Sequence, residues 1–270
     1  MKLGAVKFLN AYPLYWGLQF EPGISVKKDI PSRLADDLLR HELDIAIISS
    51  IEYHKHKNIF NYYPDLCIAA KGHIDSIRLY PGGEFSKKMP VTIESICQWL
   101  QEQKKLRIYY DIATRSSLSM LKVLLNEYCP EVCNKGQAEF VQVAPPFEKL
   151  IAHLKPQEMV LLIGDSALRL KEIPSIDMGE FYNTTFQRSF VYAIWVYRPV
   201  TGGQARDILI NAFDIGQKNY DALIQDALAE FGFDEKFTRN YLTQIVQYKF
   251  SNELKNDMSF FFEKFDNLRF

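Results

Sequence analysis

The sequence predicts an α/β fold of two lobes, each built around a central sheet, with a helical cover at the C-terminus. Three observations lead to this prediction. Short apolar runs such as residues 44–48 and 159–163 are typical of strands buried in a parallel sheet. Stretches with apolar residues at helical spacing follow several of these runs. From residue 204 onward the pattern is helical almost to the end of the chain.

Length and charge restrict the kinds of partner that the chain can have. It has 270 residues, enough for one large domain or two small lobes, and a formal net charge of −1. This balance argues against nucleic acid or an anionic membrane surface as the main partner. The first residues lack the apolar core of a signal peptide, and no run is long enough to span a bilayer. We therefore expect a cytoplasmic protein.

The four cysteines are few and scattered, which is typical of a reducing compartment. Cys129 and Cys133 have the wrong spacing for a zinc knuckle, and no histidine lies beside them. His54 and His56 alternate within a lysine-rich segment and more often form a solvated face than a metal site. We expect no metal site.

The first lobe begins with a strand at residues 5–9 that stops at Asn10. Pro13 can open a helix at its first turn. Asn10 thus follows the carboxyl end of a strand, where open α/β sheets bind ligands, although it could equally be a turn residue or helix cap. Further strands are expected at 26–30, 44–48 and 66–70, with a helix at 31–40 that Ser32 caps. The strand at 44–48 ends at two hydroxyls, Ser49 and Ser50.

The second lobe is expected to be compact and to hold a mostly parallel sheet, as is the first. We place lobe 2 at residues 86–172 and lobe 1 at residues 1–85 plus 173–270, joined by two crossovers. The expected helices of lobe 2 are 93–103, 117–126 and 146–154, and its expected strands are 106–110, 140–143 and 159–163. A long strand at 190–197 returns the chain to the first lobe. Helices near 204–217, 219–231, 235–247 and 251–267 follow.

The junction between the strand at 106–110 and the following helix holds four polar residues. They are Thr114, Arg115, Ser116 and Ser117. A helix start has unpaired N–H groups and the positive end of a dipole, so hydroxyls and a guanidinium there could hold a carboxylate or phosphate. The alternative is a capped helix with a solvated arginine.

Asp165 follows the strand at 159–163 and could cap the next helix. Its negative charge would repel an anion bound nearby. We expect this carboxylate to hold loop backbone or a hydroxyl.

Taken in order along the chain, these pieces resemble one known family. The segments that carry the resemblance are Phe8-Leu-Asn-Ala-Tyr-Pro13, Pro31-Ser32 with Leu38 and Asp44, Ser49-Ser-Ile-Glu-Tyr53, Gly72-His-Ile-Asp-Ser-Ile77, Asp111 with Thr114-Arg-Ser-Ser117, Ile163-Gly-Asp-Ser-Ala-Leu168 and Asp177-Met-Gly-Glu180. Over about residues 2–198 the chain is similar to the chorismate dehydratases of the futalosine route to menaquinone.

The resemblance implies a periplasmic-binding-protein type II fold used as a cytoplasmic, cofactor-independent hydro-lyase. The reaction would convert chorismate to 3-[(1-carboxyvinyl)oxy]benzoate and water. The resemblance points to Asn10 and Ser76 as catalytic residues near the reacting ring. The expected substrate-binding residues are Ser49 and Ser50 lining the cleft, Thr114, Arg115, Ser116 and Ser117 at a carboxylate, and Asp165. Asn10, Ser49, Ser76 and Thr114 are expected to face one cleft.

One segment departs from the family pattern. The family has a Thr-Gly-Leu-Pro-like turn before its Phe-Val strand, whereas here Thr185-Phe-Gln-Arg-Ser189 precedes Phe190. We expect Gln187 and Arg188 to lie close to the cleft. Substrate identity and pocket size therefore stay open at this point.

A second function class stays open. The same cleft and anion site would serve a non-catalytic cytoplasmic binding protein or sensor for a small carboxylate, and the altered turn is its best argument. The partner expected in either case is a small dicarboxylate, with no nucleic acid and no membrane. A homodimer is left open as the assembly.

Overall fold

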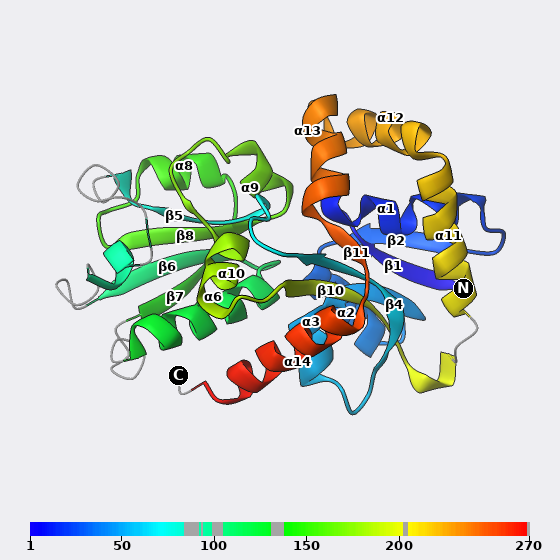
Figure 1. The fold of residues 1–270 in the computed structure, drawn as a ribbon, viewed down its shortest axis with the longest axis horizontal. Helices are drawn as coiled ribbons and strands as arrows, with labels where there is room; N and C mark the ends of the chain where they lie inside the picture. The colour runs from blue at the N-terminus through cyan, green and yellow to red at the C-terminus, as the bar shows by residue number, and fades with distance from the viewer. Residues whose placement is uncertain (84–91, 93, 99–104, 131–137, 202–204, 269–270) are drawn as a thin grey trace. The chain divides into compact units, whose positions relative to one another are not determined.

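The computed structural model describes residues 1–83, 92, 94–98, 105–130, 138–201 and 205–268. The chain divides into two compact units (Figure 1). Unit 1 contains Met1–Ala70 and Val191–Met258, and unit 2 contains Lys71–Phe190 and Ser259–Phe270. The boundaries expected at 85/86 and 172/173 differ from this division, because strands on both sides of the predicted second lobe pair with its sheet.

Unit 1 is built on a six-stranded sheet in the order β11-β4-β10-β3-β1-β2. The strands are β1 (Lys2–Val6), β2 (Ser25–Asp29), β3 (Ile45–Ser49), β4 (Asn61–Ala70), β10 (Phe190–Tyr197) and β11 (Gln247–Lys249). Strand β1 runs parallel to β2 and β3, so the carboxyl ends of these three strands meet at one edge. Strand β10 is antiparallel to β3, and β11 is antiparallel to β4.

Helices cover both faces of this sheet. The short helix α1 (Tyr12–Tyr15), the 3₁₀ helix η2 (Trp16–Phe20) and α11 (Arg206–Lys218) lie on one side, and α2 (Pro31–Leu39) and α3 (Ser50–Lys55) on the other (Figure 1). Gly17 lets η2 approach α11 closely, because a Cβ there would stand 2.0 Å from the carbonyl oxygen of Ala212. Helix α2 turns Leu34 and Leu38 into the core, as its apolar spacing predicts.

Unit 2 is built on a five-stranded sheet in the order β7-β6-β8-β5-β9. The strands are β5 (Ile77–Pro81), β6 (Leu106–Asp111), β7 (Ala138–Val143), β8 (Glu158–Ile163) and β9 (Ile176–Asp177). Strand β6 runs parallel to β7 and β8, whereas β5 is antiparallel to β8 and β9. Both sheets therefore contain parallel and antiparallel pairs. The expectation of mostly parallel sheets is wrong for the antiparallel strands β5 in this unit and β10 in unit 1.

The sheet of unit 2 also has helices on both faces (Figure 1). Helices α8 (Phe147–Ala152) and α9 (Asp165–Arg169) enclose a core with Tyr80 of β5 and with Val160 and Leu162 of β8. On the other face lie α6 (Arg115–Tyr128) and α10 (Met178–Phe186), which pack against each other. The predicted helix at 93–103 lies partly outside the described residues.

The C-terminal segment is helical, as predicted, except for two features. Helices α12 (Tyr220–Phe231), α13 (Glu235–Asn240) and α14 (Asn252–Asp266) follow α11. A π-helix at Tyr241–Ile245 and the short strand β11 replace the predicted end of the third helix. The division into units falls within α14, between Met258 and Ser259, so the chain passes between the units three times and not twice.

One local prediction, the cap at Ser32, is corrected. The N-cap of α2 is Ile30, and the buried hydroxyl oxygen of Ser32 has no hydrogen-bond partner within the described structure. Pro31 occupies the first helical position instead, where its fixed φ and missing N–H are tolerated.

Cys97 and Cys129 are joined in a disulfide, and Cys67 is a buried thiol. Cys133 lies outside the described residues.

Across the described part of the chain, no helix is both long and apolar enough to cross a bilayer.

Candidate functional site

Ser76 lies at the edge of unit 2 where strands β6 and β8 end. It immediately precedes β5, and Ile77 of β5 pairs with Ile163, the last residue of β8. The backbone of Ser76 is fixed in both directions: its N–H donates to the carbonyl of Ile74 at 2.6 Å, and its carbonyl accepts from Gly164 N at 2.7 Å. Its side chain is 1% exposed, and the hydroxyl oxygen has no hydrogen-bond partner among the described residues.

Asp177 holds the loop that carries Ser76. Its carboxylate accepts hydrogen bonds from the backbone N–H groups of Ile74 at 3.1 Å and Asp75 at 2.7 Å. It also caps α10 by accepting from Gly179 N and Glu180 N, at 2.9 and 3.0 Å. Burial raises the pKa of this carboxyl group, against the effect of the N–H donors and of Arg78 nearby. One buried carboxylate thereby fixes the backbone next to Ser76.

The start of α6 forms a second polar group at the same edge. Strand β6 ends at Asp111, whose carboxylate accepts from Ala113 N at 2.8 Å and shapes the turn. Thr114 is the N-cap residue, but its side chain makes no capping bond, and its buried hydroxyl oxygen has no partner in the described structure. Ser116 and Ser117, in the first turn, are both buried. The backbone N–H groups of this turn have no acceptor within the helix and can bind an anion.

Arg115 and Asp165 flank this group. Arg115 is the first residue of α6 and is partly exposed, so its guanidinium can reach solvent or a ligand. Asp165 is not the cap of α9: Gly164, with a φ of 64°, is the N-cap residue, and Asp165 lies in the first turn. Only glycine adopts this backbone conformation without strain. The structure therefore brings Ser76, Thr114, Ser116, Ser117 and Asp165 to one edge of one sheet.

Asn10 lies at the corresponding edge of unit 1. The strand predicted at residues 5–9 ends earlier than expected. After β1 the chain forms a 3₁₀ helix, η1 (Leu9–Ala11). The side-chain oxygen Oδ1 of Asn10 is buried and has no hydrogen-bond partner among the described residues. The backbone carbonyl of Asn10 accepts a hydrogen bond from the Tyr248 hydroxyl at 3.0 Å.

Ser49 and Ser50 lie at the same edge, but their hydroxyls hold the backbone. Ser49 caps α3, accepting from Glu52 N at 3.4 Å. The Ser50 hydroxyl donates to the carbonyl of Val191 at 2.7 Å and ties α3 to the start of β10. The Ser49 hydroxyl acts as an acceptor in its capping bond, whereas the Ser50 hydroxyl proton is used within the unit.

The segment 185–189 forms the end of α10 and the turn that follows it. Gln187 is the C-cap residue, with a φ of 53°, in the left-handed region. Arg188 stacks over Phe260 of α14, with the guanidinium carbon 4.4 Å from the ring centroid. The Thr185 hydroxyl donates to the Phe181 carbonyl at 2.8 Å, and its oxygen lies at hydrogen-bond distance, 3.2 Å, from the Tyr128 hydroxyl. Thr185 and Arg188 of the altered segment thus make contacts with other residues of unit 2.

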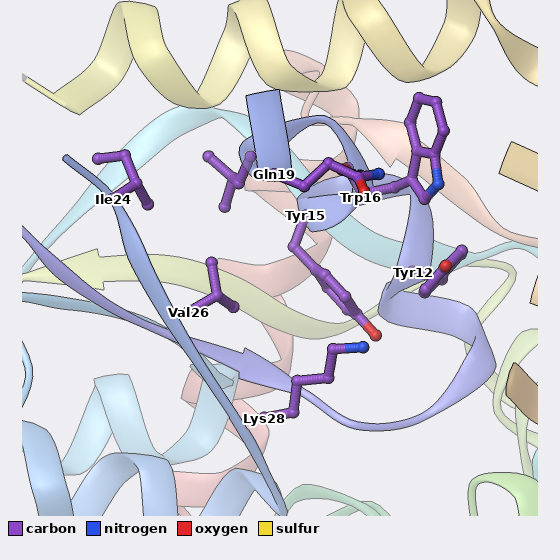
Figure 2. Close-up of a pocket in the computed structure, with 8 residues that line it drawn as sticks. Tyr12, Tyr15, Trp16, Gln19, Ile24, Val26 and Lys28 are labelled. Atoms are coloured by element: carbon purple, nitrogen blue, oxygen red, sulfur yellow. Dashed lines mark hydrogen bonds between the residues drawn. The ribbon is translucent and has the colours of Figure 1, made fainter. Parts of the chain in front are cut away.

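A cavity of about 250 Å³ lies in unit 1 beside α1, η2 and β2. Figure 2 shows the ammonium of Lys28 directed towards the rings of Tyr12 and Tyr15, and it lies 5.3 Å from the Tyr15 ring centroid. Lys28 is paired with Glu230 at 2.7 Å. Burial and the nearby Glu230 and Asp226 raise the pKa of Tyr12. Because Lys28 is already neutralised, this cavity suits a carboxylate less well than the start of α6.

Three of the predicted site residues share one property, which Ser32 and Tyr220 outside the site also have. Asn10, Ser76 and Thr114 each present a buried side-chain oxygen without a partner in the described structure, although buried polar groups are normally hydrogen-bonded. Ligand groups bound at each of these two sheet edges would supply the missing hydrogen bonds. That Asn10, Ser49, Ser76 and Thr114 face one cleft stays a prediction.

Sequence reasoning did not assign a role in the site to Asp177 or Tyr248. Asp177 belongs to one of the family segments, but its action on residues 74 and 75 depends on a contact over about one hundred residues of chain. Tyr248 lies just after the helix predicted at 235–247, in a stretch for which no strand was predicted. Among the described residues, no group of three or more histidine, cysteine, aspartate or glutamate side chains could hold a metal ion.

The sequence was compared with models of protein families and with known proteins, and both comparisons give matches in menaquinone biosynthesis or chorismate dehydration. Residues 1–266 match the model of the menaquinone biosynthesis family. The chain is 26% identical over 220 residues to a chorismate dehydratase of Thermus thermophilus, covering 73% of this chain and 69% of that protein.

Two solved structures share the fold. A protein of Archaeoglobus fulgidus superimposes with a TM-score of 0.74 at 11% identity, over 98% of this chain and 96% of that one. A Candida albicans protein, described as exhibiting the generic periplasmic binding protein fold, gives a TM-score of 0.65 at 14% identity, over 100% and 91%. The fold is therefore of the periplasmic-binding-protein type, as predicted.

Proposed function

Because the chain belongs to the menaquinone biosynthesis family, we propose that it is a chorismate dehydratase, a hydro-lyase that works without a cofactor. The similarity to the Thermus thermophilus enzyme supports this assignment. Within the described part of the molecule, the observation that supports it best is the set of buried oxygens on Asn10, Ser76 and Thr114 without partners.

The reaction makes modest demands on the protein. The C–H bond at the ring carbon that bears the enolpyruvyl ether breaks, and its electrons form the third ring double bond. The C–O bond on the neighbouring carbon breaks as this double bond forms, and the departing hydroxyl takes up a proton and leaves as water. Aromatisation favours the product, so the protein has mainly to orient the substrate and stabilise developing charge.

The two groups of residues divide this work. The first turn of α6, with Thr114, Ser116 and Ser117, binds a substrate carboxylate through backbone N–H groups and hydroxyls. Asn10 and Ser76 hydrogen-bond to the reacting ring and its hydroxyl. A neutral amide is a poor base, so the ring proton passes to a carboxylate of the substrate or to water.

Incubating the purified protein with chorismate tests the proposal. Loss of chorismate and formation of 3-[(1-carboxyvinyl)oxy]benzoate are followed by chromatography and mass spectrometry. We expect turnover that a metal chelator does not change, because the described residues contain no cluster of metal ligands. Tight binding of chorismate that is returned unchanged would instead identify a binding protein.

Replacing Ser116 or Ser117 by alanine tests the carboxylate site. Each change should weaken binding of a dicarboxylate ligand by about 1–3 kcal/mol, because a charged partner loses a hydrogen bond. Calorimetry with the aromatic product avoids turnover during the measurement. Ser119→Ala is a matched control, because its hydroxyl donates to the Arg115 carbonyl and is already used within α6. Unchanged affinity in both Ser116→Ala and Ser117→Ala would place the anion site elsewhere.

The second candidate is a non-catalytic binding protein or sensor for a small carboxylate. The fold favours it, since the same fold serves binding proteins, and neither Asn10 nor Ser76, the residues proposed at the reacting ring, is an obvious base. The chorismate experiment separates the two functions directly.

A cytoplasmic location is part of the proposed function. The Cys97–Cys129 disulfide counts against it, because disulfides are rare in cytosolic proteins. Thiol titration of protein taken from cells under acid quench would decide the state of this pair.

A further inference from the structure

The backbone carbonyl of Asn10 is held by a residue from the far end of the chain. The hydroxyl of Tyr248 donates a hydrogen bond to it at 3.0 Å, across 238 positions of sequence. Both residues belong to unit 1. The contact therefore joins the turn after the first strand to the last strand of the same sheet.

This carbonyl cannot be satisfied by the usual local donor. In a 3₁₀ helix the carbonyl of residue i accepts from the N–H of residue i+3. For Asn10 that residue is Pro13, which has no N–H. The neighbouring bonds of the turn are present, since Ala11 N donates to the Phe8 carbonyl and Tyr12 N to the Leu9 carbonyl. Tyr248 supplies the donor that the proline removes.

Tyr248 is itself held firmly. It lies on β11, which pairs with β4, and its side chain is 7% exposed. Its ring contacts that of Phe213 on α11, with the centroids 5.8 Å apart. Burial raises the pKa of Tyr248 well above its ordinary value, so its hydroxyl keeps the proton that it donates.

The segment before β11 has an uncommon geometry. Residues 241–245 form a π-helix, and Val246 N donates to the Tyr241 carbonyl at 3.1 Å where the helix ends. Such segments occur frequently at functional sites. Here the π-helix leads directly into the strand that carries Tyr248.

We infer that Tyr248 is a positioning residue for Asn10. Its hydrogen bond fixes the turn Leu9–Ala11, and so it sets the direction of the Asn10 carboxamide. This inference rests on the proposed function, in which that carboxamide acts on the substrate ring. Tyr248 itself touches no substrate.

Tyr248→Phe keeps the ring and removes only the donor. We expect kcat for chorismate to fall about tenfold, because small displacements of a catalytic group are costly, while KM changes by less than about threefold. In the Asn10→Ala background the same change should cost nothing further, since residues that act through each other are not additive. Hydrogen–deuterium exchange of residues 8–16 should be faster in Tyr248→Phe.

Tyr220→Phe is the matched control. Its buried hydroxyl oxygen has no hydrogen-bond partner within the described residues, so we expect kcat and exchange to stay at the wild-type values. Exchange needs no substrate, so it decides on the role of Tyr248 even if the wild type does not convert chorismate. Wild-type exchange of residues 8–16 in Tyr248→Phe would overturn the inference. If Tyr248→Phe lowers kcat by the same factor in the wild-type and the Asn10→Ala backgrounds, the inference is also overturned.

Discussion

Asn10→Ala should lower kcat for chorismate dehydration by about 10²-fold or more, as expected when a preorganised hydrogen-bonding group is removed from the reacting atoms. The buried Oδ1 of Asn10 has no partner among the described residues, so the carboxamide is available to the substrate. Substrate affinity should fall less, because the first turn of α6 still binds a carboxylate. Steady-state kinetics and calorimetry with the product measure the two effects separately.

Asn211→Ala provides the control for Asn10→Ala. Asn211 lies exposed on α11 in the same unit, and its amide donates to Glu21 at 2.6 Å. Its loss should leave kcat unchanged. A kcat for Asn10→Ala within about threefold of the wild type would remove Asn10 from the catalytic residues, because a lost donor at the reacting ring costs far more.

Asp177→Ala should give the largest loss of stability among the changes considered. Four backbone N–H groups, of Ile74, Asp75, Gly179 and Glu180, would lose their acceptor. Each buried donor left without a partner costs about 1–3 kcal/mol, with incomplete additivity, so we expect the free energy of unfolding to fall by about 3 kcal/mol or more. Urea denaturation followed by circular dichroism measures this loss.

Asp234→Ala is the matched control for Asp177→Ala. Asp234 also caps a helix, but it is exposed and accepts from Phe237 N at 3.0 Å. Its loss should cost about 1 kcal/mol, as is usual for an N-cap. If the two changes cost the same, Asp177 is an ordinary cap and does not hold the loop of Ser76.

The sequence predicts the long elements of this fold well. Strand β10 has the predicted bounds, because eight consecutive apolar or aromatic residues leave little choice. Strand β11 could not be predicted, since three residues of alternating polarity form a strand only through their pairing with β4. Helix α10 is not among the expected helices, and its start depends on the Asp177 cap.

The candidate site was predicted in part, and for different reasons at different residues. The hydroxyls of Thr114, Ser116 and Ser117 follow from a strand that ends before a helix, a pattern visible in the sequence. Asn10 and Ser76 came from the family resemblance. Asp177 and Tyr248 act on backbone groups far away in the chain, and no local pattern shows which backbone group a distant side chain will reach.

The position of β10 in the sheet of unit 1 affects the order in which the chain can fold during synthesis. Strands β3 and β4 follow each other in the chain, but β10 lies between them, and it begins only at Phe190. Residues 1–70 therefore leave the ribosome with β1, one partner of β3, but long before β10, the other partner, exists. All five residues of β3 are buried in the finished sheet. Until β10 arrives, β3 is an apolar strand with an open edge, the kind of surface through which nascent chains pair with one another and aggregate.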